Sequence, residues 1–261
     1  MKNYRLHLFT PMNIQKKTAL LIAVSMLLHL NIFAQNVRVA IAANLQPVMK
    51  VLRADFKQRT GISVDVISGA SGKLSAQITG GAPFDVFLSA DMKFPDVLWQ
   101  VGFATKEPVV YAYGALIIAS NKKIDVTHWQ KLLPGNAVRN IAIGDPSLAP
   151  YGSAAEEVLK KAGIYAAVEG KIVLGESIGQ VNTYITTGVV QAGFTTLSLI
   201  KDPANKTPLY WHIIDPKAYT PITHGMVLLK RGAKNATAVK FYRYMLSAPA
   251  KKILTAYGYH Q

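Results

Sequence analysis

The chain has 261 residues, a formal net charge of +15 and no cysteine. The lack of cysteine excludes disulfides, thiolate nucleophiles and cysteine-based metal sites. Lysine and arginine are scattered along the chain, with no basic block and no cluster of aromatic and basic residues of the kind that binds nucleic acid. We therefore expect a solvated basic surface and no nucleic-acid partner.

The first 34 residues have the pattern of a secretory signal peptide. Lys16 and Lys17 precede an apolar run over 18–30, and the small residue Ala34 follows it. The run approaches the length of a membrane anchor, which is the alternative interpretation. The placement of the charges and of Ala34 favours cleavage instead, and no cysteine lies near the run to carry a lipid anchor. We expect export to the periplasm, cleavage after Ala34 and a mature chain that begins at Gln35.

Removal of this segment would lower the net charge of the protein, and the sequence does not decide whether the segment starts at Met1 or at Met12. The segment contains four basic residues and no acidic one, so the net charge falls from +15 to +11 on cleavage. Met12 is as good a start as Met1, because the residues from Met12 to Lys17 form a more compact charged region. The length of the mature chain suits two modest lobes, each able to bury its own core.

Strand-like and helix-like segments alternate after this region. The first strand is 37–42, and the helix after it has Val48, Val51, Leu52 and Phe56 on one face. This alternation predicts parallel α/β sheets with helices on both faces. Further strands are expected at 62–67, 84–89, 116–119, 140–143, 171–174, 191–195 and 226–230, and further helices at 73–78, 129–133, 154–162 and 180–186.

The last two helices, 238–246 and 250–256, follow one another with no strand between them. Helices at the end of an α/β chain need a sheet face to cover, so we expect the chain to return to its first lobe. Glycine and proline are spread evenly, and no flexible linker separates the halves. The pattern predicts two lobes joined by extended crossings.

Four junctions between a strand and the next helix are rich in small or capping residues. In an open α/β sheet, ligands bind outside the carboxyl ends of the strands, where each following helix offers unpaired N–H groups and the positive end of its dipole. Asn44 is expected to cap the first of these helices, and Tyr151 to open the third. One such junction is an ordinary cap, but four can converge on one anion and satisfy it with neutral donors. The four are 42–45, 68–73, 144–153 and 175–180.

Five segments, taken in their order and spacing, resemble a known family. They are 42–44, 69–74, 81–91, 144–146 with 149–152, and 174–178. The family is that of the periplasmic molybdate-binding proteins, which are the receptors of ATP-driven molybdate importers. The resemblance extends over about 37–259, including the closing Tyr257-Gly258-Tyr259.

The resemblance implies a fold and a division into lobes. The family has the type II periplasmic-binding-protein fold, an α/β architecture in which two lobes close over a ligand cleft and are joined by two crossing strands. The crossings would lie near 113–116 and 223–226. The first lobe would comprise 35–114 together with 225–261, and the second would comprise 115–224.

The same resemblance implies a site for a tetrahedral anion, molybdate and also tungstate. Hydrogen bonds would come from the side chains and backbone of Asn44 and Ser71, and from the backbone N–H groups of Tyr151 and Ile178. Molybdenum would have no direct protein ligand, and no cofactor is expected. The partner would be the membrane permease of an ABC importer, with the receptor acting as a monomer.

Two positions depart from the family pattern. Some members have serine in place of Asn44, so the donor here is an amide rather than a hydroxyl. Some members use a tyrosine hydroxyl in the second lobe where this chain has Thr196, whose shorter side chain is not counted as a ligand. The exact coordination of the anion therefore stays open. Molybdate is the expected ligand, and because the sequence does not decide among oxyanions, a sulfate or phosphate receptor of the same fold is the alternative.

A Ser/Lys hydrolase is the alternative from a different class. Ser120 with Lys123, and Ser198 with Lys201, have the Ser-x-x-Lys spacing of penicillin-recognising enzymes, but neither pair is accompanied by Lys-Thr-Gly. The segment 69–73 lacks the first glycine and the Ser/Thr of a phosphate loop. The histidines beyond the leader have no metal-ligand spacing. We therefore expect a binding protein with no catalytic residue and no metal site.

Overall fold

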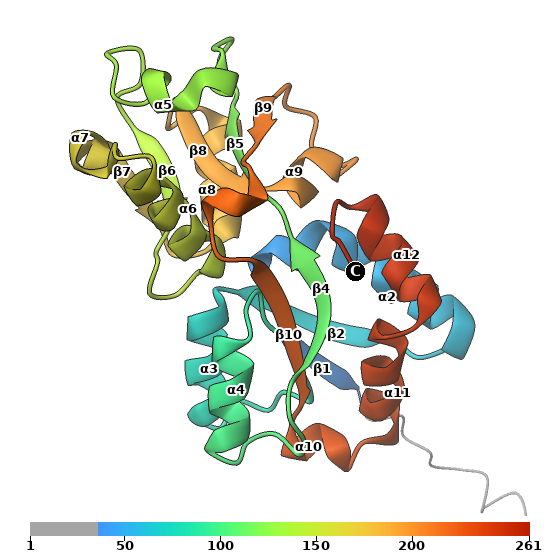
Figure 1. Ribbon diagram of the computed structural model, residues 1–261. Helices are drawn as coiled ribbons and strands as arrows, with labels where there is room; N and C mark the ends of the chain where they lie inside the picture. Colours follow the sequence, from blue (N-terminus) through green and yellow to red (C-terminus); the bar gives the residue numbers. More distant parts are fainter. Residues whose placement is uncertain (1–35) are drawn as a thin grey trace, which may run out of the picture. The chain divides into compact units, whose positions relative to one another are not determined.

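Two five-stranded sheets organise residues 36–261, the part of the chain that the computed structural model describes (Figure 1). The predicted signal peptide, 1–34, and its cleavage point lie outside the described residues. We call the part built on the first sheet lobe I and the part built on the second sheet lobe II.

The sheet of lobe I is mixed. β1 runs parallel to its neighbours β2 and β3, whereas β10 runs antiparallel to β3 and β4. The β-branched residues Val37, Val39 and Ile41 suit β1 to a buried position in the sheet, and all three are fully buried. In sheet order the strands are β2 (Val64–Gly69), β1 (Val37–Ala42), β3 (Val86–Leu88), β10 (Ile222–Leu228) and β4 (Val109–Gly114); the 3₁₀ turn η1 (Ala43–Leu45) and the helices α2 (Gln46–Thr60), α3 (Ser71–Thr79) and α4 (Lys93–Gln100) connect them.

The sheet of lobe II repeats this plan. Its apolar core includes Phe194, whose ring packs edge-on against that of Trp129 with 5.7 Å between the ring centroids. In sheet order the strands are β7 (Ile172–Gly175), β6 (Ile141–Gly144), β8 (Ala192–Thr196), β5 (Leu116–Ser120) and β9 (Tyr210–Ile213). Its helical segments are η2 (Val126–His128), α5 (Trp129–Leu132), α6 (Pro150–Lys161), α7 (Tyr165–Val168), η3 (Glu169–Lys171), α8 (Ile178–Thr187) and α9 (Leu197–Lys201), and η4 (Pro216–Ala218) leads to the return crossing.

The end of the chain returns to lobe I, as predicted. The helices α10 (Lys230–Ala233), α11 (Ala236–Met245) and α12 (Ala248–Ala256) follow β10 directly (Figure 1). Phe241 of α11 packs edge-on against Phe56 of α2, with 5.3 Å between the ring centroids. Both rings belong to the apolar core that surrounds β1.

Three expectations from the sequence need correction. The sheets are mixed rather than parallel, because the crossing strand β10 and the strand β5 run against their neighbours. Val51 is 38% exposed, since the buried face of α2 is formed instead by Val48, Met49, Leu52 and Phe56. The sequence pattern also missed α4, β4 and β9; β9 is an edge strand with exposed side chains on both faces, so it lacks the alternation that identifies a strand.

Two crossings connect the lobes, as the type II fold requires. β4 continues into β5 with only Ala115 between them, and β10 brings the chain back beside β4 (Figure 1). Gly114 lies at the first crossing, where a Cβ atom would stand 2.1 Å from the hydroxyl oxygen of Tyr151 and 2.8 Å from Nε2 of His224. Only glycine fits this close approach without a shift of the neighbouring chain.

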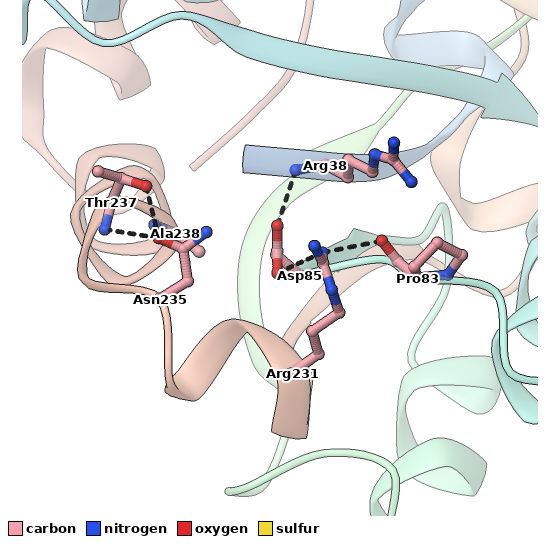
Figure 2. A network of polar contacts seen from close by, with 7 residues as sticks. All are labelled: Arg38, Pro83, Asp85, Arg231, Asn235, Thr237 and Ala238. Carbon is pink, nitrogen blue, oxygen red and sulfur yellow. Dashed lines mark hydrogen bonds and ion pairs between the residues drawn. The ribbon is translucent and has the colours of Figure 1, made fainter. Parts of the chain in front are cut away.

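A buried carboxylate holds together the start of the lobe I sheet (Figure 2). Asp85 is fully buried and accepts hydrogen bonds from the backbone N–H of Arg38, at 2.8 Å, and from Nη1 of Arg231, at 2.7 Å. The same guanidinium nitrogen donates to the carbonyl of Pro83 at 2.9 Å. Asn235 lies nearby and caps α11. This network joins β1, β3 and α10 at the N-terminal ends of the two strands, whereas the predicted site lies at their carboxyl ends.

None of the helices in the described part of the chain combines the length and the apolar character that a bilayer crossing requires.

Candidate functional site

The four predicted helix starts meet at one small cavity between the lobes. Asn44 and Ser71 line it from lobe I, and Tyr151 and Ile178 line it from lobe II, so the structure brings every predicted site residue together. Among the described residues, no charged side chain lines this cavity. A ligand would therefore be held by neutral donors. The remaining lining residues are small or apolar: Ala42, Ala43, Gly69, Ala70, Ala90, Ala149 and Pro150.

Ser71 offers two donors from the start of α3. Its hydroxyl oxygen accepts the backbone N–H of Ala90 at 3.1 Å, which leaves the hydroxyl proton available to a ligand. Its backbone N–H has no acceptor within residues 36–261, as is normal for the first residue of a helix. The residue is 1% exposed, so these donors are kept from bulk water.

Tyr151 and Ile178 offer backbone donors from lobe II. They are the second residue of α6 and the first residue of α8, and within the described chain neither N–H has an acceptor. The side chain of Tyr151 is occupied elsewhere: its hydroxyl lies 3.3 Å from the hydroxyl of Thr196 and 3.4 Å from Nε2 of His224. Tyr151 therefore presents its backbone to the cavity, and Thr196 lies outside the cavity lining.

Asn44 is not the helix cap that we expected. The 3₁₀ turn η1 moves the start of α2 beyond it, so the residues at the cap positions are Ala42 and Leu45. The Asn44 amide instead donates from Nδ2 to the hydroxyl of Tyr259 at 3.0 Å. Its Oδ1 atom is buried and has no hydrogen-bond partner among residues 36–261. Among the described residues that line the cavity, it is the only buried side-chain polar atom without a partner.

The lobes are closed over the cavity. The backbone N–H of Gly72, in lobe I, donates to the carbonyl of Leu148, in lobe II, at 3.0 Å. An ion pair between Lys73 and Glu176, 2.6 Å long, also joins the lobes, but both side chains are about half exposed and such pairs contribute little to stability. Ser198 of lobe II donates its hydroxyl to the carbonyl of Asn44 at 2.9 Å.

Comparison with known proteins identifies the family. The model of the bacterial extracellular solute-binding proteins matches residues 37–260. The chain belongs to this family.

Two relatives of this solute-binding protein are each named molybdate-binding protein ModA. The one from Azotobacter vinelandii is 35% identical over 227 residues, which are 87% of this chain and 90% of the relative. The one from Rhodobacter capsulatus is 36% identical and covers 87% of this chain and 88% of its own. The solved structure of the Azotobacter vinelandii periplasmic molybdate-binding protein has a TM-score of 0.81 and 36% identity, and the match covers 87% of this chain and 99% of that one. The predicted two-lobed fold is confirmed.

Behind its cavity, the solute-binding protein has a buried cluster of aromatic hydroxyls around His224. The two ring nitrogens of His224 lie 3.3 Å from the hydroxyl of Tyr111 and 3.4 Å from that of Tyr151. Burial lowers the pKa of His224 to about 3, so the ring is neutral at physiological pH. Burial also raises the pKa of Tyr259 to about 12, and this hydroxyl keeps its proton. The cluster therefore adds no charge beside the site.

Sequence reasoning missed two residues that contact the site. Tyr259 was noted only as part of the closing segment Tyr257-Gly258-Tyr259 of the family resemblance. Ser198 entered only as half of a Ser-x-x-Lys pair; in the structure it is 1% exposed and bonded to Asn44, while Lys201 is exposed. Ser120 bonds to the neighbouring Lys122 backbone. No pattern in the sequence indicates that these hydroxyls meet Asn44.

Proposed function

We propose that this solute-binding protein captures molybdate between its lobes and delivers it to an ABC-type importer. The observation that carries the proposal is the convergence of four helix starts, two from each lobe, on one uncharged cavity. Two relatives about 35% identical to the chain over most of its length have names that state molybdate binding. Helix starts bind oxyanions because their N–H groups lack intrahelical partners and carry the positive end of the dipole.

In the proposed complex the ligand is bound by hydrogen bonds alone. A buried dianion loses its hydration, and donors must replace the lost water contacts. Asn44 and Ser71 supply side-chain and backbone donors, and Tyr151 and Ile178 supply backbone N–H groups. Molybdenum itself has no protein ligand. Because neither lobe has the full set of donors, binding and lobe closure are coupled, and opening of the lobes releases the anion without any chemical step.

The proposal includes the arrangement of the chain in the cell. We propose a periplasmic monomer that loses residues 1–34, with lobe boundaries at 35–114 plus 225–261 and at 115–224. The change of sheet between β4 and β5 supports the first boundary, and the return crossing falls at β10, which spans Ile222–Leu228. Its role is capture and delivery without catalysis, and a membrane permease is its partner. Tungstate, which has the same charge and shape, is proposed as a second ligand.

Calorimetric titration of the protein purified from the periplasm tests this function. Molybdate and tungstate should bind much more tightly than sulfate and phosphate, and equal affinity for sulfate would overturn the assignment. The double variant Asn44→Ala, Ser71→Ala should bind molybdate at least about 100-fold more weakly, since hydrogen bonds to charged groups contribute about 1.5–3 kcal/mol each. Ser75→Ala is the matched control, because Ser75 is buried one turn along α3 but does not line the cavity.

A further inference from the structure

The carbonyl and the amide of Asn44 are held by hydroxyl groups from both lobes. The main-chain oxygen of Asn44 accepts from the hydroxyl of Tyr259 at 2.7 Å and from the hydroxyl of Ser198 at 2.9 Å. The Tyr259 oxygen also accepts from Nδ2 of Asn44 at 3.0 Å. Tyr259 belongs to the C-terminal segment of lobe I, and Ser198 to α9 of lobe II. All three residues are at most 2% exposed, so water does not compete for these bonds.

The single proton of the Tyr259 hydroxyl decides which way the Asn44 amide faces. In the structure this proton is donated to the Asn44 carbonyl, so the Tyr259 oxygen can only accept from the amide, and Nδ2 faces it. Oδ1 is then left buried without a partner, which is unfavourable. A fully ionised tetrahedral anion has only acceptors and cannot satisfy Oδ1.

A half-turn of the amide about its Cβ–Cγ bond removes this conflict. Oδ1 then lies beside Tyr259 and accepts its proton, while the Ser198 hydroxyl alone satisfies the Asn44 carbonyl at 2.9 Å. Nδ2 takes the place of Oδ1, and its two N–H groups become available to the cavity that Asn44 lines. Oδ1 of Asn44 is no longer orphaned in this arrangement, and apart from the exchange of Oδ1 and Nδ2 the heavy atoms of the three residues keep their positions.

We infer that Tyr259 and Ser198 are positioning residues that set the donor face of Asn44 for the bound anion. This inference rests on the proposed function. Ser198 reaches the Asn44 carbonyl from lobe II, so in the closed protein this carbonyl keeps a donor when the Tyr259 proton moves to Oδ1. An anion in the cavity then converts the Asn44 amide from a group that presents an acceptor to one that presents donors. Closure permits this orientation, and anion binding selects it.

Titrations of the full exported protein with molybdate and with phosphate test the inference. Tyr259→Phe and Ser198→Ala should each weaken molybdate binding about tenfold. Each should weaken phosphate binding less, because a hydrogen phosphate has a proton that Oδ1 can accept. Tyr257→Phe is the matched control: Tyr257 is a half-buried neighbour whose hydroxyl bonds to none of the described residues, and its variant should match the wild type. Thermal unfolding without anion verifies that each variant folds.

A double-mutant cycle separates positioning from general support of the fold. If Tyr259 acts through the amide, Tyr259→Phe should change the molybdate affinity less than about twofold when Asn44 is already alanine. An equal loss in both backgrounds, or an unchanged selectivity against phosphate, would overturn the inference. Selective ¹⁵N-asparagine labelling gives a readout independent of affinity: the Asn44 side-chain amide signal should shift on molybdate binding. If the wild type fails to bind molybdate, the proposed function fails; if it binds and Tyr259→Phe binds equally, only this inference fails.

Discussion

Replacing Arg231 by methionine should destabilise lobe I while leaving ligand binding intact. The fully buried carboxylate of Asp85 would lose its 2.7 Å bond to the guanidinium and keep only the N–H of Arg38 (Figure 2). Breaking a buried pair from one side costs about 3–5 kcal/mol. The Arg231 side chain is 43% exposed and water can partly replace it, so we expect the lower end, about 3 kcal/mol.

For a chain of this size, about 3 kcal/mol corresponds to a fall in Tm of ~6–12 °C, measured by circular dichroism. The control is Arg243→Met, because Arg243 is exposed on α11 and forms no ion pair with the described residues. Molybdate affinity should stay within about twofold of the wild type, since Arg38 and the cavity lie at opposite ends of β1, about 13 Å apart at the usual rise per residue. A fall in Tm no larger than that of the control would refute the role assigned to the Asp85 pair.

Three further predictions follow from the closed lobes and the crossings. Burial lowers the pKa of His224 to about 3, so the unfolded chain binds the extra proton between about pH 6.5 and 3; stability should fall across this window on acidification, and His224→Asn should flatten the Tm-against-pH curve there. Gly114→Ala should destabilise the fold by about 1–3 kcal/mol in urea unfolding, because its Cβ would stand 2.1 Å from the Tyr151 hydroxyl oxygen; an unchanged midpoint would mean that the crossing adapts. Lys73→Gln should change molybdate affinity less than about fivefold at physiological salt, since its pair with Glu176 is half exposed, and a larger loss would show that Lys73 acts on the anion directly.

The helix starts of the site could be predicted because their chemistry is local. A glycine or a small residue after an apolar run, followed by a helical pattern, specifies a strand-to-helix junction wherever the strand lies in the sheet. Ser71 and Ile178 are accordingly the first residues of α3 and α8. The helix cap expected at Asn44 was wrong because the local pattern does not include distant contacts. A 3₁₀ turn places the start of the helix beyond Asn44, and hydrogen bonds with Tyr259 and Ser198 stabilise this arrangement.

The direction and the detection of strands are also limited by what a local sequence pattern contains. Alternation of strands and helices predicted α/β lobes, but strand direction depends on where a crossing places a segment, and β10 pairs antiparallel because it returns from lobe II. The edge strand β9 has no buried face to produce a periodic signal.

By itself, the sequence determined the α/β class, the return of the last helices and the four junctions that carry the site, because periodicity and turn chemistry act over a few residues. The tertiary structure alone decided that Tyr259, Ser198 and Asn44 are joined by hydrogen bonds. Tyr259 lies 215 positions from Asn44 in the sequence and Ser198 lies 154 positions from it, so they meet only when the C-terminal segment docks and the lobes close. A buried hydroxyl acquires its role from the acceptor it meets, and no local pattern encodes that acceptor.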